Sequence, residues 1–236
     1  MTKPGTKNSY PEQTSWRALR MGPAIHMRIN SERAQLDGYM ILKRAMDVCI
    51  AGFAWLMLSP LFYFIILMIK ITSPGSAFYR WKVVGEGGRY FTSFKFRSMY
   101  SNADELKREL LHLNEMTGPV FKISKDPRVT PLGRVLRKFS IDELPQLWSI
   151  MKGDMSLVGP RPPLQAEYEL FSNWQKKKLA VKPGATCLWQ TNGRNDISDF
   201  DEWVRLDLEY IEHRSLGLDV KILMDTVRTL LIGTGK

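Results

Sequence analysis

Residues 48–69 read VCIAGFAWLMLSPLFYFIILMI, a run of 22 residues without a charged side chain. As a straight helix this run would be roughly 33 Å long, against a bilayer hydrocarbon core of ~30 Å. A buried helix of a soluble core is the alternative, but such helices are seldom this long and apolar on every side. The run therefore predicts a membrane segment.

The middle and the two flanks of this run argue against a simple span. Pro60 lacks a backbone N–H and predicts a bend, and the Ser59 hydroxyl could bond a carbonyl that the bend frees. Lys43 and Arg44 precede the run and Lys70 follows it, and basic flanks favour the cytoplasmic side of a membrane. Both ends favour the same side, which is typical of a re-entrant helix-break-helix, although proline also kinks helices that span.

The composition is that of a folded protein with a basic first half. The chain has 236 residues, 44% hydrophobic and 25% charged, which excludes a chain disordered throughout and a polytopic membrane protein. The excess behind its net charge of +10 lies in residues 1–140, which carry 22 basic and 10 acidic side chains. Such an excess indicates an anionic partner: nucleic acid, anionic lipid or a phosphorylated substrate. Cys49 and Cys187 belong to no CxxC pair, so neither a disulfide framework nor a zinc site is expected.

The chain divides into three regions. Residues 1–38 are polar with several Pro and Gly and predict a flexible tail, residues 39–72 hold the membrane helix, and residues 73–236 predict a small globular domain. Within that domain, residues 77–99 read as a β-hairpin, because two aromatic and β-branched stretches flank a Gly-rich turn. Helices are expected at residues 101–116, 132–139, 164–180, 199–213 and 218–232, with a loop at 182–195. The expected fold class is α-rich α+β.

The helix expected at residues 132–139 has a basic amphipathic pattern. Leu132, Val135, Leu136 and Phe139 recur at i, i+3, i+4 and i+7, while basic residues take other positions. This pattern suits an interface helix on an anionic membrane surface, or a helix in a protein groove. An ordinary helix packed on the core fits equally well.

The pair Asp142-Glu143 is the candidate catalytic centre. By spacing alone, Asp142 is a good N-cap for a helix that begins at Glu143, and Ser140 with Glu143 also matches a capping box. The functional interpretation uses the same geometry, because a helix N-terminus favours anions. One carboxylate could attack a phosphorus atom while the other holds a divalent cation.

Several cationic side chains are candidates for binding a substrate. Arg161 lies between two prolines, and a guanidinium with so little freedom suits bidentate phosphate binding. Arg194 is displayed by an Asn-Gly turn and could reach a phosphate or a nucleotide. The alternative for Arg161 is a stiff loop that exposes the side chain, and the alternative for Arg194 is a plain turn without a binding role. Lys95 and Arg97 share one face of the second hairpin strand, which by residue type alone is typical of a solvated face.

These motifs occur in an order that resembles the bacterial sugar transferase family, the monotopic phosphoglycosyl transferases. The resemblance covers about residues 40–232, and its most specific segments are DELPQ and GDMSLVGPRP. The motifs that carry it are Lys43-Arg44 with Asp47, Ser59-Pro60, Lys95-Phe96-Arg97-Ser98-Met99, Asp126-Pro127-Arg128, Gly133-Arg134, Asp142-Glu143-Leu144-Pro145-Gln146, Gly153-Asp154-Met155-Ser156, Gly159-Pro160-Arg161-Pro162, Pro183-Gly184 and Asn192-Gly193-Arg194.

The resemblance implies an activity and a location. Members of this family move a sugar 1-phosphate from a nucleotide sugar, usually a UDP-sugar, onto undecaprenyl phosphate at the cytoplasmic face of the bacterial inner membrane. UMP is released, and the product begins an exopolysaccharide or a related glycan. The stretch TCLWQTNGRNDISDFDEW is similar to members that use glucose or galactose.

The resemblance also implies roles for individual residues. Asp142 would be the nucleophile that forms a phospho-sugar enzyme intermediate, and Glu143 would help to hold Mg²⁺. Arg161 would contact phosphate. The remaining implied positions are Arg194, Lys95 and Arg97 in substrate binding, and Ser59 and Pro60 at the membrane break.

These implications rank the possible functions. The expected partners are a UDP-sugar, undecaprenyl phosphate and anionic membrane lipids, with a homo-oligomer possible. A non-catalytic, membrane-anchored assembly protein of a polysaccharide pathway is the alternative. Nucleic acid is not expected, because a 22-residue uncharged apolar segment serves no such partner.

Overall fold

The computed structural model describes residues 23–191 and 197–233, with side chains from residue 36 onward. It divides into two units, Met1–Gly38 and Tyr39–Lys236. Helix α1 (Pro23–Thr72) begins in the first unit, within the stretch expected to be a flexible tail. Proline suits the first helical position, and residues 24–36 include good helix formers such as Ala, Met, Arg, Glu and Gln.

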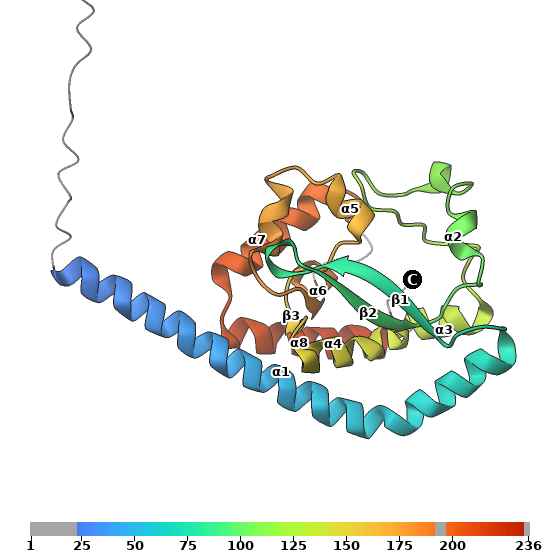
Figure 1. Ribbon diagram of the computed structural model, residues 1–236, viewed down its shortest axis with the longest axis horizontal. Helices are drawn as coiled ribbons and strands as arrows, with labels where there is room; N and C mark the ends of the chain where they lie inside the picture. The colour runs from blue at the N-terminus through green and yellow to red at the C-terminus, as the bar shows by residue number, and fades with distance from the viewer. Residues whose placement is uncertain (1–22, 192–196, 234–236) are drawn as a thin grey trace, which may run out of the picture. The chain divides into compact units, whose positions relative to one another are not determined.

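In the second unit, α1 is followed by short elements, with 3₁₀ helices written η. These are β1 (Phe78–Val84), η1 (Glu86–Gly88), β2 (Tyr90–Phe96), α2 (Ala103–Leu106), η2 (Leu111–Leu113), α3 (Pro131–Lys138), η3 (Ile141–Gln146), α4 (Leu147–Lys152), β3 (Ser156–Val158), α5 (Gln165–Glu169), η4 (Gln175–Ala180), β4 (Gly184–Thr186), α6 (Leu188–Thr191), α7 (Phe200–His213) and α8 (Leu216–Ile232). Figure 1 shows α3, α4 and α8 on the side of the domain next to α1, with the hairpin beyond them. An α-rich fold with a short hairpin is therefore confirmed.

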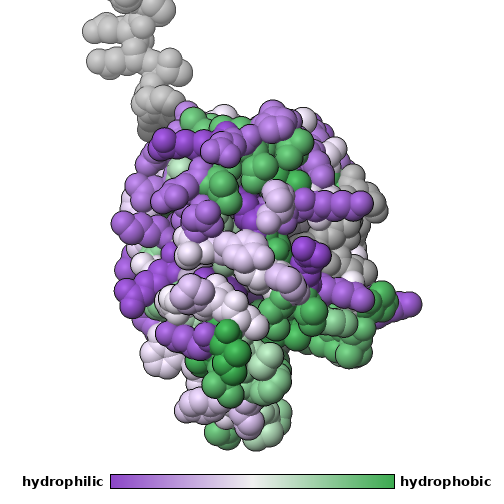
Figure 2. Space-filling model, turned by 90° about the vertical axis from the view of Figure 1, so that its right-hand side faces the viewer, coloured by the Kyte–Doolittle hydropathy of each residue, from purple (hydrophilic) through white to green (hydrophobic). Residues whose placement is uncertain are grey.

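Helix α1 is apolar and largely uncovered where the sequence predicts a membrane segment. The stretch Leu36–Thr72 is long and apolar enough to cross a membrane, and only 17% of its most apolar window is buried inside the protein. Phe53 and Tyr63 are 67% and 75% exposed. Hydrophobic residues gather at the lower edge of the face in Figure 2, the edge that α1 occupies in Figure 1. The alternative of a helix buried in a soluble core is thus wrong.

The helix bends where it contains Pro60. Figure 1 shows α1 changing direction in its cyan stretch. In a regular helix the N–H at position 60 would bond the carbonyl of Leu56, four residues back. The Ser59 hydroxyl donates to this carbonyl oxygen at 2.8 Å instead. Ser59 therefore satisfies a carbonyl that Pro60 cannot, which matters where water is absent.

A buried ion pair fastens α1 to α8. The Lys43 ammonium lies 2.9 Å from the Asp219 carboxylate, which is fully buried. The Tyr39 and Tyr210 hydroxyls donate to the same carboxylate at 3.0 and 2.7 Å. Three donors compensate the desolvation of Asp219, as a buried charge requires.

Two further motif residues fasten the next turn of α1. The Arg44 guanidinium donates to the carbonyls of Ile150 and Met151, at 2.6 and 2.7 Å. These carbonyls lie in the last turn of α4, where a cation complements the helix dipole. The Asp47 carboxylate accepts the backbone N–H of Leu157 in β3 at 2.9 Å. The Lys-Arg…Asp motif thus joins α1 to three different elements.

The hairpin, α3, α7 and α8 form where the sequence predicts them. Strands β1 and β2 are antiparallel, with Trp81 opposite Ser93. Gly87 and Gly88 between them have φ of 64° and 81°, a conformation that glycine adopts without strain. In α3, Leu136 is buried and Leu132 packs against the core, while Val135 is 53% exposed.

Two expected helices are broken. Residues 101–116 form α2 and η2 joined by turns, and residues 164–180 form α5 and η4. Of the leucines at helical spacing in 101–116, Leu113 is 44% exposed and Leu106 and Leu110 are only partly buried, so the three cover no continuous part of the core. Without tertiary packing a helix of this length is marginal, which explains the turns.

The loop expected at residues 182–195 contains a strand and a helix. Strand β4 pairs with β3 in parallel, Ser156 opposite Gly184 and Val158 opposite Thr186. A Cβ on Gly184 would lie 2.1 Å from the backbone nitrogen of Gly159, so only glycine permits this approach. Strands of three residues are too short to show an alternation of apolar and polar residues, so the sequence pattern did not predict them.

The core lies in two clusters. One joins the second half of α1 to the hairpin: the rings of Phe62 and Phe96 meet edge to face, with centroids 5.4 Å apart. The other surrounds α7 and contains Trp189 and Trp203. The pocket described next lies beside residues of both clusters.

Candidate active site

A cavity of about 370 Å³ brings the hairpin, η3, α6 and α7 together. Its lining includes the candidate residues Asp142, Glu143, Lys95, Arg97 and Arg161. Trp189, which by its place in the sequence could stack on a base or simply pack, lines it as well. Residues that carried no predicted role also line it, among them Tyr79, Trp81, Asp104, Lys107, Phe121, Lys122, Asp126, Arg128, Arg137, Glu167 and Trp203. Arg194, the remaining candidate, lies outside the described residues. Candidate residues as far apart in sequence as Lys95 and Arg161, which are 66 positions apart, therefore line one pocket.

Asp142 lies inside η3, which corrects both capping interpretations. The N-cap of η3 is Ser140, with no side-chain cap bond and a left-handed backbone (φ 52°, ψ 24°). A capping side chain normally requires an extended backbone at that residue, so Ser140 cannot form the capping box. The chain turns sharply here after α3, and this turn brings Asp142, 7% exposed, to the pocket.

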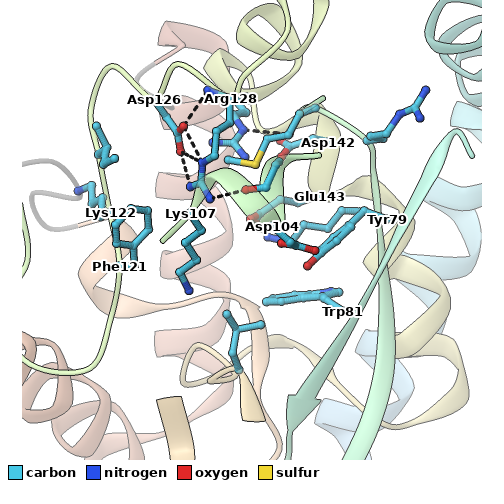
Figure 3. A pocket seen from close by; sticks show the side chains of 18 of the residues that line it. Tyr79, Trp81, Asp104, Lys107, Phe121, Lys122, Asp126, Arg128, Asp142 and Glu143 are labelled. Atoms are coloured by element: carbon cyan, nitrogen blue, oxygen red, sulfur yellow. Dashed lines mark hydrogen bonds and ion pairs between the residues drawn. The ribbon is translucent and has the colours of Figure 1, made fainter. Parts of the chain in front are cut away.

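Glu143 is paired with Lys95. The Lys95 ammonium lies 2.6 Å from the Glu143 carboxylate and 4.2 Å from the centre of the Trp81 ring. The side chains of Lys95 and Glu143 are 16% and 19% exposed, so the pair is only partly screened by solvent. The alternative of a solvated strand face is wrong for Lys95. Figure 3 shows Trp81 and Glu143 on the same side of the pocket.

Arg97 is engaged by the end of α1. Its guanidinium donates to the carbonyls of Ser73 at 2.7 Å and Pro74 at 2.6 Å. These carbonyls directly follow Thr72, the last residue of α1, where the negative end of the helix dipole favours a cation. Arg97 therefore links the pocket wall to the point where α1 ends.

Arg161 lies beside a pair of stacked indoles. Its guanidinium is 6.0 Å from the centre of the Trp203 ring. The Trp203 and Trp189 rings stack with centroids 4.0 Å apart and an interplanar angle of 18°. Both tryptophans are almost fully buried, so Trp189 packs against Trp203 rather than presenting an open face to a base.

The opposite wall of the pocket is built around a buried ion pair. Arg128 donates to the Asp126 carboxylate, with Nη2 to Oδ2 at 2.6 Å, and its guanidinium lies 5.1 Å from the Phe121 ring. Figure 3 shows this pair, with Phe121 and Lys122 across the pocket from Trp81. Burial alone would raise the pKa of Asp126, but the hydrogen bonds and charge of Arg128 outweigh it and hold this pKa below its usual value.

Tyr79 is a pocket residue that the sequence did not single out. Burial raises the pKa of its hydroxyl, and the negative charge of Asp104 acts in the same direction, while Arg128 opposes both. Tyr79 and Trp81 alternate with other residues along β1, so they read in sequence as ordinary strand positions. Only the pairing of the hairpin with η3 turns this face into a pocket wall.

The donor set at the centre of the pocket fits a magnesium ion. Asp142 and Glu143 supply carboxylate oxygens, which are the ligands that Mg²⁺ prefers. Among the residues that the structure describes, no group of three or more His, Cys, Asp and Glu side chains could hold a metal. Mg²⁺ commonly takes only one or two carboxylates and completes its shell with substrate phosphates and water. The site therefore suits a Mg²⁺ ion that arrives with a phosphorylated ligand.

A family model described as "Bacterial sugar transferase" matches residues 38–233, which is most of the chain. Three relatives are similar over most of the same region. The galactosyl transferase CpsE of Streptococcus agalactiae serotype III (strain NEM316) is 46% identical over 197 residues, covering 84% of this chain and 44% of CpsE. The exopolysaccharide production protein ExoY of Rhizobium meliloti (strain 1021) is 41% identical over 197 residues, covering 82% of this chain and 87% of ExoY.

The third relative is an undecaprenyl-phosphate galactose phosphotransferase of Salmonella typhimurium (strain LT2). It is 42% identical over 210 residues, covering 87% of this chain and 43% of that protein. The chain thus spans less than half of CpsE and of the Salmonella protein, but nearly all of ExoY.

Proposed function

The chain belongs to the bacterial sugar transferase family, and on that premise we propose that it is a phosphoglycosyl transferase. It transfers a hexose 1-phosphate from a UDP-sugar to undecaprenyl phosphate and releases UMP. The observation that carries the proposal is the place of Asp142 and Glu143, which line one cavity together with Lys95 and Arg161. Two carboxylates among cations suit chemistry at a phosphate.

The reaction takes place in two displacement steps on one carboxylate. In the first, an Asp142 oxygen attacks the phosphorus next to the sugar, and the bond from that phosphorus to the bridging oxygen breaks, so UMP leaves. In the second, a phosphate oxygen of undecaprenyl phosphate attacks the same phosphorus. The bond to Asp142 then breaks, which frees the carboxylate and leaves a sugar-diphosphate lipid. One nucleophile thus serves a soluble donor and a lipid acceptor in turn.

The neighbouring side chains hold the donor and orient the carboxylates. Arg161 binds a phosphate of the donor, and its position between two prolines limits the freedom lost on binding. Lys95 fixes Glu143 through their 2.6 Å contact and adds positive charge to the cavity that Asp142 also lines. Glu143 would help to hold the Mg²⁺ ion, which would neutralise charge on the donor phosphates.

The names of the relatives support galactose as the transferred sugar. Two of the three relatives are named for galactose transfer, and the third for exopolysaccharide production. We therefore expect UDP-galactose to be the donor, with UDP-glucose next. The product would begin an exopolysaccharide or a related glycan.

The membrane arrangement follows from the exposed apolar surface. The bent apolar helix α1 enters the cytoplasmic leaflet and returns, and its basic flanks bind anionic headgroups. Helix α8 lies at the interface, because it exposes an apolar stripe at i, i+4, i+7 and i+11. The stripe consists of Val220, Met224, Val227 and Leu231, which are 49%, 68%, 54% and 78% exposed. This arrangement holds Asp142 at the level of a polyprenyl phosphate.

The test is a substrate panel with the purified full-length chain in nanodiscs. UMP release is followed with UDP-galactose, UDP-glucose and UDP-N-acetylgalactosamine, with and without undecaprenyl phosphate and Mg²⁺. We expect sustained release only when a hexose donor, the lipid acceptor and Mg²⁺ are all present. Absence of release with every donor contradicts the proposal and favours a non-catalytic assembly protein.

A further inference from the structure

Behind the pocket lies a buried ion pair that the proposed reaction does not use. Lys178 in η4 and Asp207 in α7 are 2% and 1% exposed, and the Lys178 ammonium lies 2.5 Å from the Asp207 carboxylate. Lysine and aspartate are almost never fully buried unless they are paired. An apolar pair of similar volume would often be equally stable or more stable, so stability alone does not explain these two charges.

The groups around the pair connect it to Arg161. Burial raises the pKa of Asp207, while the charge of Lys178 and the backbone N–H and guanidinium of Arg161 act in the opposite direction. The buried Cys187 thiol also lies near Asp207, Lys178 and Arg161, and burial raises its pKa. Asp207 therefore lies between an ammonium on one element and the loop that carries Arg161.

The same face of α7 contacts this loop at two further points. Trp203, one helical turn before Asp207, lies 6.0 Å from the Arg161 guanidinium. Tyr210, one turn after Asp207, donates its hydroxyl to the carbonyl of Val158 at 3.2 Å. The buried face of α7 thus follows the chain from Val158 to Arg161, and Asp207 lies at its centre.

We propose that Asp207, held by Lys178, is a positioning residue that fixes the Arg161 loop so that the guanidinium points at the donor phosphate. The proposal rests on the proposed function, because it concerns the phosphate that Arg161 binds. The carboxylate attracts the loop through the positive charge of Arg161, and Lys178 holds the carboxylate in place. On this proposal, the buried charges of Lys178 and Asp207 serve the geometry of the Arg161 loop rather than the stability of the fold.

The test separates positioning from stability with a pair of apolar replacements. Asp207→Asn, Lys178→Met and the double variant Lys178→Met/Asp207→Leu are compared with the wild-type full-length chain in nanodiscs. The exposed pair Lys152 and Asp154, 2.9 Å apart, is neutralised in the same way as a matched control. The measurements are the thermal unfolding midpoint, and the KM for UDP-galactose and kcat from UMP release.

We expect the two single variants to lose stability, because each leaves one buried charge unpaired. The apolar double variant regains the wild-type midpoint, but its KM for UDP-galactose remains about tenfold higher, with a smaller change in kcat. Neutralising the control pair should leave both KM and kcat unchanged. A double variant with the wild-type midpoint and the wild-type KM would overturn the positioning role.

A mutant cycle covers the case in which the double variant does not fold. Asp207→Asn is measured in the wild type and in an Arg161→Ala background. If Asp207 acts through Arg161, its replacement raises KM in the first background and leaves it unchanged in the second. Additive effects contradict the role. A wild-type chain without UMP release contradicts the proposed function and the positioning role with it, whereas an active wild type with additive effects contradicts the positioning role alone.

Discussion

The Lys95 ammonium lies 2.6 Å from the Glu143 carboxylate, although the two residues are 48 positions apart in the sequence. The contact joins the hairpin to η3, so the strand that forms one pocket wall also orients the carboxylate pair. The Trp81 ring, 4.2 Å from the same ammonium, fixes Lys95 from the other side.

Removal of this cation should slow the reaction. Lys95→Met removes the Lys95 contact of Glu143 and one positive charge from the wall of the pocket. A hydrogen bond to a charged group contributes about 1.5–3 kcal/mol, so kcat/KM from UMP release should fall about 10- to 100-fold. Lys82→Met is the matched control, since Lys82 is an exposed lysine on β1 outside the pocket. Equal activities of the two variants would show that the contact is incidental.

The attachment of α1 to α8 should dominate stability in the folded domain. Asp219→Ala leaves the buried Lys43 ammonium and the Tyr39 hydroxyl without the carboxylate, and the Tyr210 hydroxyl with only the Val158 carbonyl as acceptor. Loss of one partner of a buried pair costs about 3–5 kcal/mol in the free energy of unfolding. The measurement is denaturant unfolding in detergent. Lys152→Met, which changes an exposed lysine, is the control and should change the free energy of unfolding by less than about 1 kcal/mol. A similar loss of stability in both variants would contradict the account.

The bent helix should return to the side of the membrane from which it enters. Exposed positions next to each end are replaced as Leu42→Cys and Ile71→Cys, in a Cys49→Ser background because Cys49 is itself exposed. An impermeant thiol reagent added to intact cells should label neither position, and both should react after the cells are opened. Labelling of one position in intact cells would establish a span.

The wall opposite Trp81 should weaken in acid. The pKa of Asp126 in the folded chain lies below its ordinary value of 3.8. The ion pair with Arg128 therefore contributes fully above pH 3.8 and loses its contribution as pH falls through the lower pKa of the folded state. The difference in unfolding midpoint between the wild type and Asp126→Asn should be constant at higher pH and shrink below that value. If the difference between the two unfolding midpoints grew as the pH fell, the predicted role of the ion pair would be contradicted.

The sequence predicted the elements whose patterns are long and local. The hairpin, α7 and α8 each bury one face over many residues, and the run of α1 is uncharged and apolar on every side, so these patterns alone specify the elements. The Asp142-Glu143 pair was singled out because its spacing suggests a helix N-terminus and because its segment DELPQ resembles the sugar transferase family. Its capping interpretation failed because the left-handed turn at Ser140 depends on how α3 packs, which no local pattern records.

Other parts of the site depend on contacts between distant segments. Lys178 lies in a run of three lysines that reads as a solvated face, yet its side chain is buried because Asp207 meets it from another helix. Arg97 was predicted to bind substrate and does line the pocket, but the sequence did not indicate that its guanidinium also bonds the Ser73 and Pro74 carbonyls just after α1. Such roles follow from tertiary partners, which residue type and spacing do not identify.

The central claim is that Asp142 carries the sugar phosphate between the two substrates. The most direct test is the intact mass of the full-length chain after exposure to UDP-galactose and Mg²⁺ without the lipid acceptor, followed by an EDTA quench. The wild type should gain the mass of one hexose phosphate and lose it when undecaprenyl phosphate is added, whereas Asp142→Asn should gain nothing. An Asp142→Asn chain that forms the adduct, or that releases UMP at the wild-type rate, would contradict the account.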